Sequence, residues 1–180
     1  MTAQELIDRY NIRLEIGSNG QPTGRALVYN VKLVKADNAN AELASRAPEY
    51  KAILMQQWQA EQDAIKARAE KIAAIPGLAE IEAASEDLAA WREEFARSFN
   101  DVGGLGVRPK PTTDIDGLLK QYPRAAAYLK AESYSLADHY AKAAAGKKAL
   151  EKIINGDDYA QALAEMDKEW SDYCADHMWD

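Results

Sequence analysis

Residues 48–99 contain the longest helical pattern in the chain, and this pattern limits the folds that the chain can adopt. Apolar side chains recur at helical spacing from Pro48 to about Ala74, and again from Leu78 to Phe99. Pro76-Gly77 lies between the two stretches and indicates a helix end. Two long helices joined by a short turn are typical of an antiparallel helical hairpin. The sequence therefore predicts a largely helical protein with a helical hairpin over residues 56–100.

Residues 1–55 show a mixed pattern of helices and strands. Thr2 followed by Glu5 predicts a capping box at the start of a helix over residues 3–9. Alternating apolar residues then indicate strands. The pattern predicts, in order, a strand over 12–16, a turn over 17–24, a strand over 27–33 and a helix through about Ser45. This segment is expected to form an αββα module.

The second half of the chain follows a glycine- and proline-rich segment at residues 101–113. Helices are predicted over 115–120, over 123–145 with a bend at Gly146 before continuing to Ile154, and over about 158–178. The predicted fold class is α+β, predominantly α. Its expected parts are the αββα module (1–55), the helical hairpin (56–100), a linker loop (101–113) and a C-terminal helical bundle (114–180).

Composition limits the cellular compartments in which we expect the protein. The one cysteine, Cys174, excludes an internal disulfide framework and suits a reducing compartment. No apolar run approaches the roughly 20 residues that a membrane-spanning helix needs. The first ten residues are polar, which is unlike a secretory signal peptide. We therefore expect a cytoplasmic protein without a membrane partner.

Charge is distributed unevenly along the chain. The net charge is −7, and residues 157–180 alone carry eight acidic side chains against one lysine. Residues 104–152 carry nine Lys or Arg side chains against five acidic ones. Opposite charge on separate segments indicates a recognition surface, because fields of this kind steer association.

The acidic final helix allows three interpretations. In the first, its carboxylates only face solvent; in the second, they pair with the basic middle of this chain; in the third, they enter a positively charged groove of a partner. Its aromatic residues suit an interface. The loop cations Arg108 and Lys110 either belong to a linker or insert into a partner. The candidate partner-binding residues are Arg108, Lys110, Asp158, Glu165, Glu169, Trp170, Asp172, Tyr173 and Trp179.

The basic middle of the chain provides an alternative, nucleic-acid-binding set. Contact with a phosphate backbone requires clustered cations and no base-reading motif. The candidates are Lys120, Arg124, Lys142, Lys147, Lys148 and Lys152. An ordinary solvated helix face is the competing interpretation, and a sequence pI near 5.0 argues against strong independent DNA affinity.

No catalytic or metal-binding motif emerges. Cys174 and His177 share a helix face, with Asp172, Asp176 and His139 as further conceivable ligands, but a zinc site normally requires four ligands in paired spacings. Gly103-Gly104-Leu105-Gly106 lacks the lysine of a phosphate-binding loop. We expect a protein that is not an enzyme and that has no metal and no cofactor.

The order of elements in residues 3–55, ending in Arg46-Ala47-Pro48-Glu49-Tyr50-Lys51-Ala52-Ile53-Leu54, resembles small αββα docking modules. Such modules start some nonribosomal peptide synthetase chains and some phage replication proteins. Lys51 follows Pro48-Glu49 here instead of preceding them, which departs from the pattern of those modules. The resemblance implies protein–protein docking.

The whole chain is similar in size and texture to small phage and mobile-element proteins of gut Firmicutes. The segments that carry the similarity are 122–129 and 145–156. The type II-A anti-CRISPR proteins are the functional group that it implies. The expected function is therefore non-enzymatic inhibition of a nucleic-acid-handling enzyme, with a type II-A CRISPR nuclease or its guide-RNA complex as partner. A phage nucleic-acid accessory or replication protein and a docking or dimerisation module are the alternatives.

Overall fold

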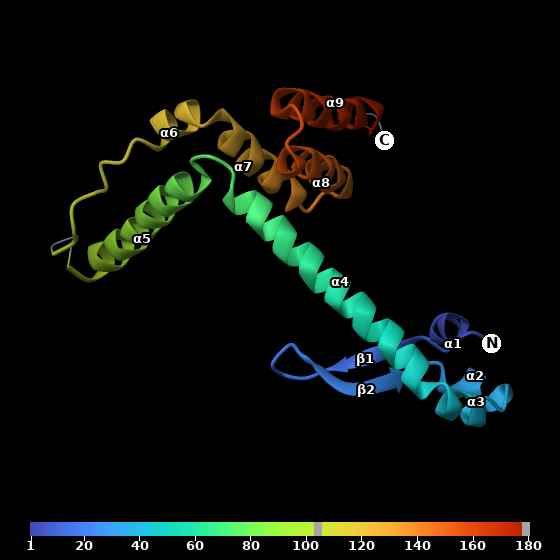
Figure 1. The fold of residues 1–180 in the computed structure, drawn as a ribbon. Coiled ribbons are helices and arrows are strands. Elements are labelled where there is room, and N and C mark those ends of the chain that lie inside the picture. Colours follow the sequence, from blue (N-terminus) through green and yellow to red (C-terminus); the bar gives the residue numbers. More distant parts are fainter. Residues whose placement is uncertain (103–105, 178–180) are drawn as a thin grey trace. The chain divides into compact units, whose positions relative to one another are not determined.

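The fold is α+β and predominantly helical, as the sequence predicts. A computed structural model describes residues 1–102 and 106–177, and side chains within 1–99 and 106–177. The chain divides into two compact units, residues 1–67 and 68–180, and each has its own hydrophobic core. Figure 1 shows the helices and strands of both units. The predicted boundary between residues 55 and 56 falls within one long helix, α4 (Ala47–Ala73).

Unit 1 follows the predicted helix–strand–strand–helix order. Its elements before α4 are α1 (Ala3–Tyr10), β1 (Ile12–Ile16), β2 (Pro22–Val28), α2 (Val31–Ala36) and α3 (Asn40–Ser45). The predicted capping box is confirmed, because the Thr2 hydroxyl accepts from the Glu5 amide at 3.2 Å and the Glu5 carboxylate accepts from the Thr2 amide at 2.7 Å. Asn11 ends α1 in the left-handed conformation with a φ of 49°.

The second strand was predicted in the wrong place. β2 covers residues 22–28, whereas the alternating pattern indicated 27–33, and residues 31–36 are helical. β1 and β2 are antiparallel with Ile12 opposite Val28. The pairing of the two strands ends where the Asn30 amide donates to the Tyr10 carbonyl at 3.0 Å. Tyr10 is the last residue of α1, and the backbone groups before it are hydrogen-bonded within that helix, so they cannot pair with a longer second strand. Pairing with β1 therefore overrides the local alternation.

The core of unit 1 is formed by α1, β1, α2, α3 and the start of α4. Its most fully buried large side chains are Leu6, Tyr10 and Ile12. Tyr10 also donates a hydrogen bond from its hydroxyl to the Asp37 carboxylate at 3.0 Å, and Arg9 pairs with the same carboxylate at 2.7 Å. This network joins α1 to the end of α2.

In the part of unit 2 that the structure describes, the end of α4 is followed by five further helices. They are α5 (Leu78–Val102), α6 (Ile115–Gln121), α7 (Pro123–Ser135), α8 (Tyr140–Asn155) and α9 (Tyr159–His177). The helices α7, α8 and α9 pack on one another, and α5 packs on α6 and α7. The two long helices of the predicted hairpin are present as α4 and α5. Their packing on each other stays a prediction, because most of α4 belongs to unit 1.

Gly146 does not bend the helix, contrary to the sequence prediction. The break comes earlier, at residues 136–139, and α8 runs unbroken through Gly146. Gly146 is buried where α8 meets the end of α7, and a Cβ atom on it would lie 2.3 Å from the Ser135 backbone nitrogen. The glycine therefore permits close approach of two helices, and this requirement leaves no local sequence signal.

The described residues contain neither a membrane-spanning helix nor a cluster of metal ligands. No helix there is both long enough and apolar enough to span a bilayer. In the same part of the chain, no three His, Cys, Asp or Glu side chains gather in a way that would hold a metal ion.

Candidate partner-binding surface

Four aromatic rings gather at one end of the C-terminal bundle. His139 meets Trp170 and Tyr173 edge-on, with ring centroids 5.0 and 4.9 Å apart. Trp170 and Tyr173 are stacked at 5.9 Å, and Tyr173 stacks on His177 at 4.0 Å. Distances and orientations of this kind are favourable for aromatic pairs. We call His139, Trp170, Tyr173 and His177 the ring cluster.

The local structure accounts for the ring cluster. Trp170, Tyr173 and His177 are three and four residues apart on α9, so they share one face of that helix. His139 precedes α8 as its N-cap residue, and the bundle brings it against that face. The Lys142 ammonium lies 4.5 Å from the Tyr134 ring centroid and 5.7 Å from that of Trp170, which ties α7, α8 and α9 together at this end.

Large apolar side chains are exposed next to His139. Leu136 is 78% exposed and Tyr140 is 79% exposed, the largest values among the exposed large hydrophobic residues of the described chain. Leu136 follows the last residue of α7 in the turn that carries His139, and Tyr140 is the first residue of α8. Trp170 and Tyr173 are half-buried, whereas His139 and His177 are exposed. Exposed apolar side chains close to aromatic rings are typical of an interface. Sequence reasoning missed Leu136 and Tyr140, because the predicted helix over 123–145 contained no turn here.

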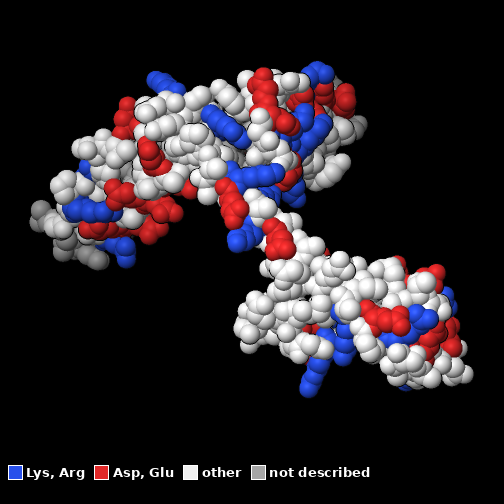
Figure 2. Space-filling view, in the orientation of Figure 1, with Lys and Arg blue, Asp and Glu red and all other residues white. Residues whose placement is uncertain are grey.

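The acidic residues of α9 pair with the basic middle of the same chain. Glu165 forms an ion pair with Lys152, and Glu169 forms one with Lys148. Asp167 pairs with Lys130 at 2.6 Å. Red and blue atoms accordingly lie next to one another over α8 and α9 in Figure 2. Of the three interpretations of the acidic helix, intramolecular pairing is the one that these contacts match.

The pairing also affects titration. Hydrogen bonds from Lys152 and Gln161 lower the pKa of Glu165 below its ordinary value. The Glu169 carboxylate raises the pKa of Lys148. Both shifts favour the charged forms, as expected for groups beside an opposite charge. Because these groups are exposed, their contribution to stability is small and screened by salt.

The remaining acidic candidates have structural partners too. The Asp158 carboxylate accepts from the Ala160 amide at 2.9 Å and caps α9. Asp172 lies 3.5 Å from Lys168 on the next turn of the same helix. Trp179 lies outside the described residues.

Most side chains of the alternative nucleic-acid-binding set already have partners within this chain. Arg124 donates to the Ile153 carbonyl at 2.6 Å, near the end of α8. Lys148 and Lys152 are in the ion pairs above, and Lys142 lies over aromatic rings. Within the described residues, Lys120 and Lys147 are the exposed members of the set without an ion pair. The structure therefore does not gather these six cations into one open basic surface.

The loop cations Arg108 and Lys110 have different environments. Arg108 pairs with Asp87 at 2.8 Å and with Glu94 at 3.2 Å, and its carbonyl accepts from the Trp91 indole at 2.9 Å. These contacts hold the loop against α5, and a role of Arg108 in partner binding stays a prediction. Lys110 lines a groove beside α5.

Comparison with protein-family models, with curated proteins and with solved structures gives no match for this chain.

Proposed function

We propose that this protein binds another protein through the ring cluster together with Leu136 and Tyr140. The observation that carries the proposal is the exposure of these two side chains beside a preassembled group of aromatic rings. Full burial of a large aliphatic side chain such as Leu contributes roughly 1.5–3 kcal/mol. Rings that are already held by their neighbours lose little conformational freedom on binding, so more of that free energy appears as affinity.

We infer that the partner is a nucleic-acid-handling enzyme and that binding inhibits it without catalysis. The similarity to small mobile-element proteins supports this class of partner, and a type II-A CRISPR nuclease with its guide RNA is the specific hypothesis. Such a nuclease holds its heteroduplex in a positively charged channel. Glu165 and Glu169 already pair with lysines of this chain. We therefore infer that the aromatic surface provides most of the affinity and that the acidic helix contributes only long-range electrostatic steering.

The test combines a binding assay with a cleavage assay. The full chain is mixed with a purified type II-A nuclease–guide complex, and the mixture is analysed by size-exclusion chromatography and by cleavage of a matched DNA target. We expect a stable complex and loss of cleavage. If the chain neither elutes with the nuclease nor slows cleavage, the assignment of this partner is wrong.

A pair of variants tests the surface itself. The double variant Leu136→Ser, Tyr140→Ser removes the exposed apolar groups without altering the core, and we expect affinity to fall at least about tenfold. Ile65→Ser is the matched control, because Ile65 is 61% exposed and lies in unit 1. Equal binding by the double variant and the parent would reject the ring-cluster surface even if the nuclease is the partner.

The two alternative functions have their own readouts. A nucleic-acid accessory protein would retain duplex DNA in a gel-shift titration at low salt, and retention would weaken when Lys147 is neutralised. A dimerisation module would elute at twice the 19.9 kDa mass of one chain. Lys148 and Lys152 form ion pairs with α9, and this pairing does not favour DNA binding. We therefore prefer protein binding as the function.

A further inference from the structure

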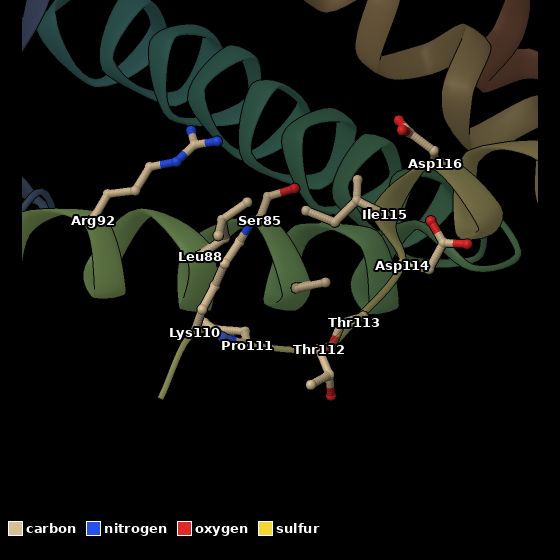
Figure 3. A pocket seen from close by; sticks show the side chains of 11 residues that line it. Ser85, Leu88, Arg92, Lys110, Pro111, Thr112, Thr113, Asp114, Ile115 and Asp116 are labelled. Atoms are coloured by element: carbon tan, nitrogen blue, oxygen red, sulfur yellow. The ribbon is translucent and has the colours of Figure 1, made fainter. Parts of the chain in front are cut away.

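A groove of about 600 Å³ runs between α5 and the segment at residues 110–116 (Figure 3). Ser85, Leu88 and Arg92 line it from α5, and Lys110 lines it from the opposite side. None of these residues belongs to the ring cluster. The groove is therefore separate from the ring cluster and from Leu136 and Tyr140.

The two ends of the groove carry opposite charges. Arg92 stands toward one end in Figure 3, and the Lys110 side chain extends from its segment toward α5. Asp114 and Asp116 lie toward the other end. Among the described residues, Arg92 and Lys110 have no ion-pair or hydrogen-bond partner. Two cations without partners at one end of a groove favour an anionic group of a ligand at that end.

The length of the groove suits a short extended segment. Its α5 wall runs from Ala84 to Arg92, which corresponds to about 12 Å at the helical rise of 1.5 Å per residue. An extended peptide advances about 3.3 Å per residue, so roughly four residues span this length. An acidic and a basic residue three positions apart would then reach the two ends.

The opposite wall offers free backbone groups. Residues 109–113 form no backbone–backbone hydrogen bond with any described residue. The amides of Lys110, Thr112 and Thr113 are donors, because only Pro109 and Pro111 in this stretch lack an N–H. The wall is held in place at its start by Arg108, which pairs with Asp87 and Glu94. An anchored segment with unpaired backbone groups can add a strand from a ligand.

We propose that this groove binds an extended peptide segment of a partner protein, with an acidic residue at the Arg92–Lys110 end and a basic residue at the Asp114–Asp116 end. The charges select the peptide and its direction, while the backbone of residues 110–113 and the side chain of Leu88 contact its main chain and apolar positions. The inference does not depend on the function proposed for the ring cluster.

The test uses two blocked synthetic peptides and the ¹⁵N-labelled full chain. One peptide contains Glu-Val-Thr-Lys and the other the reversed order Lys-Thr-Val-Glu, each flanked by Gly-Ser, because the direction of the strand decides which order fits. Amide chemical shifts detect affinities down to the millimolar range. We expect one order to shift signals of residues 84–92 and 110–116, and the same peptide with both charges replaced by Gln to bind at least tenfold more weakly.

Matched variants separate specific binding from charge attraction. The double variant Arg92→Glu, Lys110→Glu should reduce affinity for that peptide at least tenfold, and its unperturbed spectrum elsewhere would report an intact fold. Arg97→Glu is the control, because Arg97 is exposed on α5 but does not line the groove. The proposal is overturned if neither peptide shifts the groove signals, if shifts appear only at the ring cluster, or if Arg97→Glu weakens binding as much as the double variant.

Discussion

Replacing Gly146 with alanine tests whether close packing of α7 on α8 decides the structure of the bundle. A Cβ atom at this position would lie 2.3 Å from the Ser135 nitrogen and 2.6 Å from the Tyr134 carbonyl carbon. Both are backbone atoms, so no side-chain rotation relieves the clash. The end of α7 must move by about 1 Å to restore ordinary van der Waals contact.

The expected change in the free energy of unfolding follows from two opposing effects. Overpacking a buried site costs about 1–3 kcal/mol, and a clash with backbone atoms belongs at the upper end of that range. Alanine in place of glycine in a helix interior stabilises the helix by about 1 kcal/mol. The expected net change is a loss of about 2 kcal/mol, which lowers the Tm of the 68–180 unit by roughly 8 °C.

The assay is urea unfolding followed by tryptophan fluorescence in a Trp58→Phe background, which silences the tryptophan of unit 1. Ala144→Gly, at an exposed position of α8, is the control and should cost about 1 kcal/mol from helix propensity alone. A Gly146→Ala protein as stable as its parent, or more stable, would refute the close-packing argument, because propensity alone predicts a gain.

Three further predictions concern buried and paired polar groups. Asp37→Asn should lower stability at neutral pH, because hydrogen bonds from Arg9 and Tyr10 hold the pKa of Asp37 below its usual value. In urea unfolding at a series of pH values, the difference in stability between this variant and the parent should shrink as the pH falls below about 4. Burial beside Glu132 raises the pKa of Tyr128 to about 12, so the parent should lose stability between about pH 10 and 12 relative to Tyr128→Phe, and an equal loss in both proteins would contradict this. Arg124→Met should lower the Tm of unit 2 by several degrees, because the Ile153 carbonyl loses a charged donor worth about 1.5–3 kcal/mol, while Lys120→Met, at an exposed site, should leave it unchanged.

Features that depend on neighbouring residues were predictable from the sequence. The capping box at Thr2, the end of α1 at Asn11 and the ends of the long helices around Pro76-Gly77 each arise within a few residues of chain. The uneven charge also led to a correct alternative, since pairing of the acidic last helix with the basic middle was among the interpretations that the sequence allowed.

The tertiary structure alone decided features that join distant residues. The position of β2 depends on where β1 starts after α1, and the break at 136–139 depends on α8 folding back on α7 over Gly146. The ring cluster depends on the same turn, which brings His139 against α9 and leaves Leu136 and Tyr140 exposed. Helix propensity and alternation describe a residue and its neighbours in the chain, whereas burial and exposure are set by segments 20 to 40 residues away, as in the Lys148–Glu169 and Lys130–Asp167 pairs.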